Sequence, residues 1–230
     1  KLIQLVSSVP GSTWYINPPN ATNNIYFVFV SDSSVVAGKT MIANMSFNGG
    51  RNPGWTFGAI NYTGGTSGSP GSWGDTGYWS SGYMPGAYDT VNINGYMTLA
   101  QGYSAAMLTI GSGYSMNLAG YALTAANGIY NNGTMTMIGN EAITGAITNA
   151  AGSTVRYTGT STYTALKGGT NYSNLTFDGT GGRWNADGHI TVTGAVNVAS
   201  GTFDLGSKNL TVSGNFTVNG TFNSGTGTVE

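Results

Sequence analysis

Charged side chains are scarce in this chain of 230 residues. Asp, Glu, Lys and Arg together make up 7% of it, whereas an ordinary soluble domain has about 25%. The seven Lys and Arg residues are scattered singly, and the formal net charge is −1. No basic patch is available to neutralise a phosphate backbone, so nucleic acid is excluded as the expected partner.

Cysteine is absent altogether, and His189 is the only histidine. These counts exclude disulfide bonds and metal sites built on clusters of Cys or His. The lack of cysteine fits a secreted protein held together by hydrogen-bonded ladders, and it fits a cytoplasmic protein as well.

Long apolar runs are also missing. No run approaches the roughly eighteen residues needed to cross a bilayer, so we expect no membrane span. The chain starts at Lys1 without an initiator Met or a signal peptide, and it ends at Glu230 within a strand pattern. We expect both ends to be cuts through a longer protein.

Residues that favour strands and turns replace the missing charge. Glycine contributes 38 residues, and Thr, Ser and Asn are abundant. Thr favours strands, while Gly and Asn favour turns and positive φ angles. Stretches rich in Ala, Leu, Glu and Lys are few, so the composition predicts an all-β protein.

A period of about twenty residues runs through the C-terminal part of the chain. Ile190–Gly194 (ITVTG) returns as Leu210–Gly214 (LTVSG), and Val196–Val198 (VNV) returns as Phe216–Val218 (FTV). Within each period, apolar residues alternate with Thr, Ser or Asn, which is typical of short strands with one buried face. The repeat predicts a β-solenoid with about twenty residues per coil. A β-sandwich is the second alternative, because its strands would recur without this sustained echo.

The pattern divides the chain into three regions. Residues 1–57 are expected to form the terminal coils of a first solenoid module. Residues 58–88 are rich in Gly, Ser and aromatics and are expected to form a linker or a cap. Residues 89–230 are expected to form a second module of some seven coils that continues beyond the chain. Residues 159–173 do not fit the coil and are expected to form a protruding loop.

Several segments resemble a known family of proteins. Ile3–Ile16, Tyr26–Ser34 and the closing run Gly50–Phe57 (GRNPGWTF) resemble the last coils of modules in very large repetitive bacterial surface proteins. Asn174–Gly179 and Gly206–Val212 are similar to the right-handed β-helix repeats of the same adhesin-like proteins. The resemblance implies a right-handed parallel β-helix that is secreted or displayed on a cell surface, and it brings no catalytic residues.

Candidates for catalysis or metal binding are few. Asp187 and Asp204 are the only carboxylates expected on adjacent coils, and a glycosidase needs two carboxylates about 5–9.5 Å apart. We expect both to be exposed turn residues, and we expect His189 at a solvent-exposed turn. Asn185–Gly188 faintly resembles a calcium loop but lacks the further carboxylates of such a site. We therefore predict no catalytic residue, no metal and no cofactor.

Aromatic residues are the better functional signal, because 5 Trp and 14 Tyr exceed what a narrow solenoid core needs. Trp73, Tyr78, Trp79 and Tyr83 lie together in a Gly-rich segment, and Trp184 lies in an expected turn. Exposed rings can stack on sugars, so these five residues are candidate contacts to a carbohydrate or another partner. The alternative is that the rings cap a coil end or cover a junction between modules.

The sequence thus predicts a non-enzymatic extracellular structural protein, a segment of a surface adhesin or of a self-assembling filament. Its expected partners are further copies of itself, joined end to end or laterally, and surface polysaccharide. The strand edges at Lys1–Val6 and near Val229 are the expected joining points. Two alternatives remain open: a carbohydrate-binding or polysaccharide-degrading β-helix protein, and a segment of a trimeric phage tail fibre.

Overall fold

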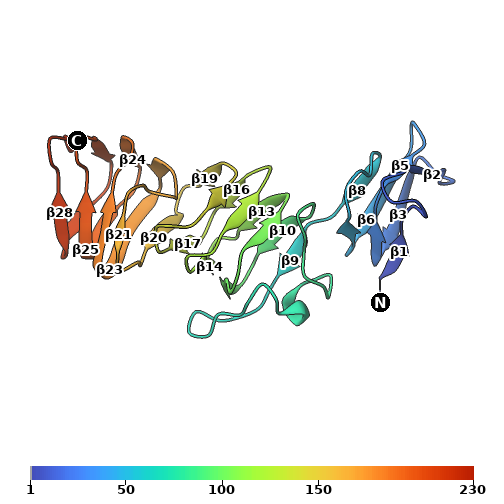
Figure 1. Cartoon of the computed structure of the whole chain (residues 1–230), viewed down its shortest axis with the longest axis horizontal. Helices are drawn as coiled ribbons and strands as arrows, with labels where there is room; N and C mark the ends of the chain where they lie inside the picture. Colours follow the sequence, from blue (N-terminus) through green and yellow to red (C-terminus); the bar gives the residue numbers. More distant parts are fainter. Residues whose placement is uncertain (1) are drawn as a thin grey trace.

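The chain forms a parallel β-solenoid of about ten turns with about twenty residues per coil. The computed structural model describes residues 2–230; Lys1, which the prediction placed at a joining edge, lies outside the described residues. Figure 1 shows the strands stacked along one long axis, from the blue N-terminal coils to the red C-terminal ones. The described residues contain one helical element, a 3-10 turn η1 at Thr76–Tyr78. The predicted all-β solenoid is therefore confirmed.

Three parallel sheets build the N-terminal coils. Their strands are, sheet by sheet, β1 (Ile3–Leu5), β4 (Val28–Val30) and β7 (Phe47–Asn48); β2 (Trp14–Ile16) and β5 (Ser33–Val35); β3 (Thr22–Tyr26), β6 (Thr40–Asn44) and β8 (Trp55–Phe57). The next strand, β9 (Ile60–Tyr62), pairs with a later strand and belongs to the second stack of coils.

The second stack of coils contains two long sheets. One consists of β9, β10 (Thr90–Ile93), β13 (Met107–Ile110), β16 (Ile129–Asn131) and β19 (Ile147–Asn149). The other consists of β11 (Tyr96–Thr98), β14 (Ser115–Asn117), β17 (Thr134–Met137), β20 (Thr154–Tyr157), β23 (Asn174–Asn185), β25 (Val196–Asp204) and β27 (Phe216–Val218), with β21 (Thr162–Tyr163) beside β23 and β28 (Thr221–Asn223) beside β25.

The third side of these coils changes sheet partway along the solenoid. It begins as β12 (Tyr103–Ala105), β15 (Leu123–Ala125) and β18 (Ile143–Thr144), and it continues as a separate sheet of β22 (Asn171–Tyr172), β24 (Ile190–Val192) and β26 (Leu210–Val212). Every pairing between these strands is parallel.

Alternation along each strand determines which residues enter the core. In β10 the side chains of Val91 and Ile93 are fully buried while Thr90 and Asn92 face outward, as expected for a strand with period two. In-register pairing then stacks like on like, so Met97, for example, lies beside Met116 and Met116 beside Met135. These apolar ladders need no charge, which explains the composition.

The solenoid has two apolar cores. The smaller one belongs to the N-terminal coils and contains six buried side chains, Val28, Val30, Val35, Met41, Ala43 and Trp55. The larger one runs without a break from Ile60 to Leu210. Phe47 of β7 joins the larger core because it projects from the outer face of its sheet.

A compact joint connects the two stacks of coils. The Phe47 ring meets the edge of Tyr83 at a centroid distance of 5.8 Å. Beside it, the Asn48 amide donates to Oδ1 of Asp89 at 3.0 Å, and the amide of Gly86 donates to Oδ2 at 2.8 Å. The Asp89 side chain lies out of solvent, and this burial raises its pKa. One carboxylate therefore links β7 to the segment that begins β10.

The loop expected over residues 159–173 is only partly present. Tyr163 of β21 pairs beside Trp184, and Tyr172 of β22 pairs beside Val192, so both ends of the segment belong to the coil. Both tyrosines are buried. Residues 164–170 alone form the connection, and the coil keeps its ordinary length, because Thr154 pairs with Asn174 just as Thr134 pairs with Thr154. None of the helical residues described forms a segment long and apolar enough to cross a membrane.

Candidate functional site

The three tryptophans offered as partner contacts are buried, which corrects that part of the prediction. Trp73 and Trp184 have 0% of their surface exposed and Trp79 has 3%. None of the three rings presents a face on which a sugar could stack. Burying such large apolar rings removes apolar surface from water and so stabilises the folded chain. This stabilisation outweighs what the rings could gain by staying exposed to stack on a sugar.

Trp73 and Trp79 close the N-terminal end of the larger core. Trp73 stacks on Tyr103 of β12 at 5.1 Å, and Trp79 packs edge-on against Trp73 at 5.1 Å and against Tyr62 at 5.0 Å. The Trp79 indole donates to the Trp73 carbonyl oxygen at 2.7 Å. Trp79 also forms an antiparallel bridge with Tyr62. The segment thus covers core side chains that the first coil would leave open to water.

Tyr78 and Tyr83 retain exposed ring surface, 45% and 38% respectively. Tyr78 packs edge-on against Tyr62 at 5.8 Å, and Tyr83 packs edge-on against Phe47. Each ring therefore has a structural neighbour on one side and solvent on the other. A contact of these two residues with a partner stays a prediction.

Trp184 lies inside β23, so the predicted turn at this position is wrong. Its indole donates to the carbonyl oxygen of Ile138 at 3.0 Å, and its ring stacks on Tyr163 at 5.9 Å. Phe177, from the same strand, packs against it at 5.4 Å. The glycines that precede Trp184 suggested a turn, but here they let one strand bend around a corner of the coil and continue pairing.

The carboxylates considered for catalysis have structural partners. Asp204 forms an ion pair with Arg183 on the preceding coil. Asp187 is exposed and accepts a hydrogen bond from the Leu166 amide at 3.3 Å. His189 is exposed, and its Nδ1 accepts from the Asn209 amide at 3.0 Å. Within residues 2–230, no group of three His, Cys, Asp or Glu side chains is placed to hold a metal ion.

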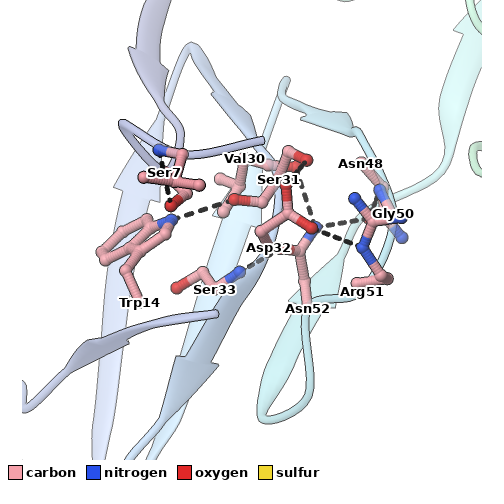
Figure 2. A network of polar contacts seen from close by, with 11 residues as sticks. Ser7, Trp14, Val30, Ser31, Asp32, Ser33, Asn48, Gly50, Arg51 and Asn52 are labelled. Carbon is pink, nitrogen blue, oxygen red and sulfur yellow. Dashed lines mark hydrogen bonds and ion pairs between the residues drawn. The ribbon is translucent and has the colours of Figure 1, made fainter. Parts of the chain in front are cut away.

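A polar network stabilises the last corner of the N-terminal coils (Figure 2). Asp32, after β4, forms an ion pair with Arg51, after β7. Both residues have left-handed backbone angles, with φ of 60° and 56°, which is uncommon for residues other than glycine. The hydrogen bond from Arg51 holds the pKa of Asp32 below its ordinary value. The pair therefore links two stacked corners that both have this strained backbone conformation.

Asn52 is the centre of the same network. Its Nδ2 donates to the Val30 carbonyl oxygen at 2.8 Å and to Oδ1 of Asn48 at 2.7 Å. Its Oδ1 accepts from the amide of Ser33 at 3.0 Å. Figure 2 shows these contacts converging between two coils. The closing run Gly50–Phe57, which carries the family resemblance, thus has a structural role in this chain.

A small cavity of about 330 Å³ lies beside β18, where the third side of the coil changes sheet. Ile143, Ile147 and Lys167 contribute to its walls. Glu141 borders it, but the Glu141 carboxylate accepts three backbone N–H bonds, from Gly120, Ile138 and Gly139, at 2.6–3.0 Å. These three hydrogen bonds hold two successive turns together, so the Glu141 carboxylate has a structural role.

The larger concave feature is a groove of about 600 Å³ at the corner where β23 and β25 bend. One wall is a row of outward side chains from successive coils, Thr162, Arg183, Thr202 and Thr221, which pair in register. We call this feature the corner groove. Because the row crosses four coils spaced about 4.8 Å apart, the groove follows the solenoid axis for about 14 Å.

Bare backbone forms the floor of the corner groove. A Cβ atom on Gly182 would lie 2.3 Å from the carbonyl oxygen of Gly159, and one on Gly201 would lie 2.4 Å from that of Gly179. At Gly220 the corresponding distance is 2.6 Å, to the carbonyl oxygen of Gly201. Stacked coils therefore leave no room for side chains on these glycines, which line the groove. Sequence reasoning missed it, although the glycines of the repeat were its signal.

Comparisons with protein-family models, with curated proteins and with solved structures found no match to this chain.

Proposed function

We propose that this chain is a non-enzymatic structural segment of an extracellular surface protein, an adhesin or a filament, that supplies reach, stiffness and attachment. The observation that carries the proposal is the ladder within each of the two stacks of coils: parallel pairing and stacked apolar side chains repeat from coil to coil, over about ten turns in all. Ion pairs between adjacent coils, Arg156 with Asp178 and Arg183 with Asp204, reinforce it. Such a ladder resists bending because every coil shares its backbone hydrogen bonds with the next.

The state of the carboxylates supports a non-enzymatic role. Asp32, Asp178 and Asp204 each have an arginine partner, and Glu141 is saturated by backbone amides. A hydrolase of the β-helix type would need one carboxyl group to donate a proton and a second to act as base or nucleophile. In the described part of this chain, the four carboxylates instead bind other groups of the protein and hold neighbouring coils together.

Self-association is part of the proposal. At the two ends, β1 pairs only with β4, while β27 and β28 pair only with β25 among the described strands. A parallel edge of this kind is a template for a further strand, either from the same chain or from another copy, and the second case would join copies end to end. Lateral association and contact with surface polysaccharide remain in the proposal as further modes of attachment.

Immuno-electron microscopy of the native material tests the proposed function. With an antibody against the described residues, we expect label on thin rods or fibres that project from the cell surface. Cells treated with pre-absorbed antibody are the control. Label confined to the cell interior, or to compact particles without a surface attachment, would contradict the proposal.

A further inference from the structure

The corner groove has the composition of a polar binding site. Its lining includes the hydroxyls of Thr162, Thr202 and Thr221 along the row, together with the side chains of Ser200 and Asn219. Thr162, Thr221 and Asn219 are exposed, while Thr202 and Ser200 are partly exposed. Hydroxyl and amide groups both donate and accept hydrogen bonds, so this lining matches a ligand that is itself rich in hydroxyls.

Charge is balanced along the groove. Arg183 forms an ion pair with Asp204, and its Nε donates to Oδ1 of Asn185 at 3.3 Å. On the other side, Ser200 donates to Oδ1 of Asp178 at 3.3 Å, and that carboxylate is paired with Arg156. A phosphate or carboxylate ligand would gain little from these arginines, because an aspartate already neutralises the charge of each. The groove is therefore matched to a neutral ligand.

The groove also disfavours an extended peptide. A peptide strand binds by adding to an unpaired sheet edge and by placing alternate side chains into pockets. Here the two central strands of the wall, β23 and β25, pair with neighbouring strands on both sides, which leaves them no edge for a peptide, and among the described strands an unpaired edge remains only at the end strands β21 and β28. Apart from glycines, the lining includes one apolar residue, Ala199, so it offers little for the apolar side chains of a peptide.

We propose that the corner groove binds a neutral polysaccharide chain that lies along the solenoid axis. The glycine floor lets the chain approach the backbone closely, and the row offers a threonine hydroxyl in three of its four coils, with Arg183 in the other. This inference gives the attachment role of the proposed function a defined surface and rests on that role. It also relocates the sugar contact from the tryptophans to the corner of β23 and β25.

Affinity electrophoresis of the whole chain tests the inference. Gels contain dextran, mannan, laminarin or hydroxyethylcellulose as neutral probes, with polygalacturonate as an anionic one. We expect retardation in at least one neutral gel. Retardation in none of the neutral gels, or in polygalacturonate alone, would overturn the proposal.

Two blocking variants and one control locate the binding. Thr202→Trp and, independently, Thr221→Trp place a large ring in the groove, and each should weaken binding at least tenfold. Thr191→Trp is the matched control, because Thr191 is an exposed outward residue of β24 on another side of the coil; it should bind as the wild type does. Equal binding by all four proteins would overturn the assignment. Rods of unchanged length from the blocked variants would show that loss of glycan binding leaves the structural role intact.

Discussion

Individual glycines determine how closely the coils stack. Gly201 has φ of +73°, and its missing side chain lets the coil approach the carbonyl oxygens of Gly179 and Gly182. Gly206 also has positive φ, +59°, but nothing lies within 4 Å of where its Cβ would be. A side chain added at Gly206 therefore tests the effect of the backbone angle alone. One added at Gly201 tests that effect together with the lack of space.

Gly206→Ala should cost about 1–2 kcal/mol of the free energy of unfolding, because it places an L side chain in a left-handed conformation. Gly201→Ala should cost about 1–3 kcal/mol more, since the added methyl must also push a neighbouring coil away. Denaturant titration of both variants measures the difference. Equal losses of unfolding free energy in the two variants would show that the close approach of the coils at Gly201 does not affect stability.

Asn52 is the second residue whose role is specific enough to test. Asn52→Ala removes three hydrogen bonds and leaves the amide of Ser33 buried without its partner. We expect a loss of about 2–4 kcal/mol, since each unsatisfied buried group costs about 1–3 kcal/mol. Asn20→Ala is the control, because Asn20 is exposed and its change should stay within about 0.5 kcal/mol. A difference between the variants below that value would contradict the role of the network.

At the scale of elements, the twenty-residue period predicted the coil because its cause is local. Alternation in segments such as Ile190–Val192 and Leu210–Val212 follows from side chains that face inward and outward in turn. The positions of Trp73 and Trp184 were not predictable in the same way. Whether a ring next to glycines is exposed depends on what packs over it, and Tyr103 and Tyr163 come from other coils.

The corner groove was hidden for a related reason. Its floor arises from contacts between glycines about twenty residues apart, Gly159, Gly179, Gly201 and Gly220. A single sequence shows that these glycines recur, but not that they lie above one another at a bend within β23 and β25. The ion pair of Arg183 with Asp204 likewise links two coils and becomes visible only when their register is known.

The two stacks of coils should differ in local stability. The N-terminal coils bury six apolar side chains in their own core, whereas the larger core extends from Ile60 to Leu210. Hydrogen exchange should therefore release the amides of β4 and β6 before those of β13 and β16, because local opening exposes less apolar surface there. Mass spectrometry of exchanged peptides measures this order. Indistinguishable protection would indicate that the Asp89 joint makes both stacks one cooperative unit.

Across the whole molecule, buried tyrosines make stability sensitive to alkaline pH. Burial raises the pKa of Tyr62 to about 12, and it also raises the pKa of Tyr157 and of Tyr172 above the ordinary value. A folded-state pKa above the unfolded value of about 10 means that the folded state holds its proton more tightly. This contribution is fully present below pH 10 and is lost as the pH rises through the folded-state pKa.

Tyr62→Phe should reduce that alkaline loss. Its hydroxyl is buried without a hydrogen-bond partner, so the variant should be at least as stable as the wild type at neutral pH. Tyr15→Phe is the control, since Tyr15 is 74% exposed. Phenolate absorbance and denaturant titration between pH 8 and about 12 follow both changes. If the Tyr62 hydroxyl lost its proton over the same pH range as the exposed tyrosines, the result would contradict the packing at this end of the core.

Parallel stacking sets a relation between chain length and molecular length. One coil of about twenty residues advances the axis by about 4.8 Å, or about 0.24 Å per residue, compared with about 1.5 Å per residue in an α-helix. Most residues of each coil therefore add to the width of the solenoid and not to its length. It also follows that length changes cleanly only in whole coils, because a deletion of one residue within a strand such as β25 would shift its register and turn its inward side chains outward.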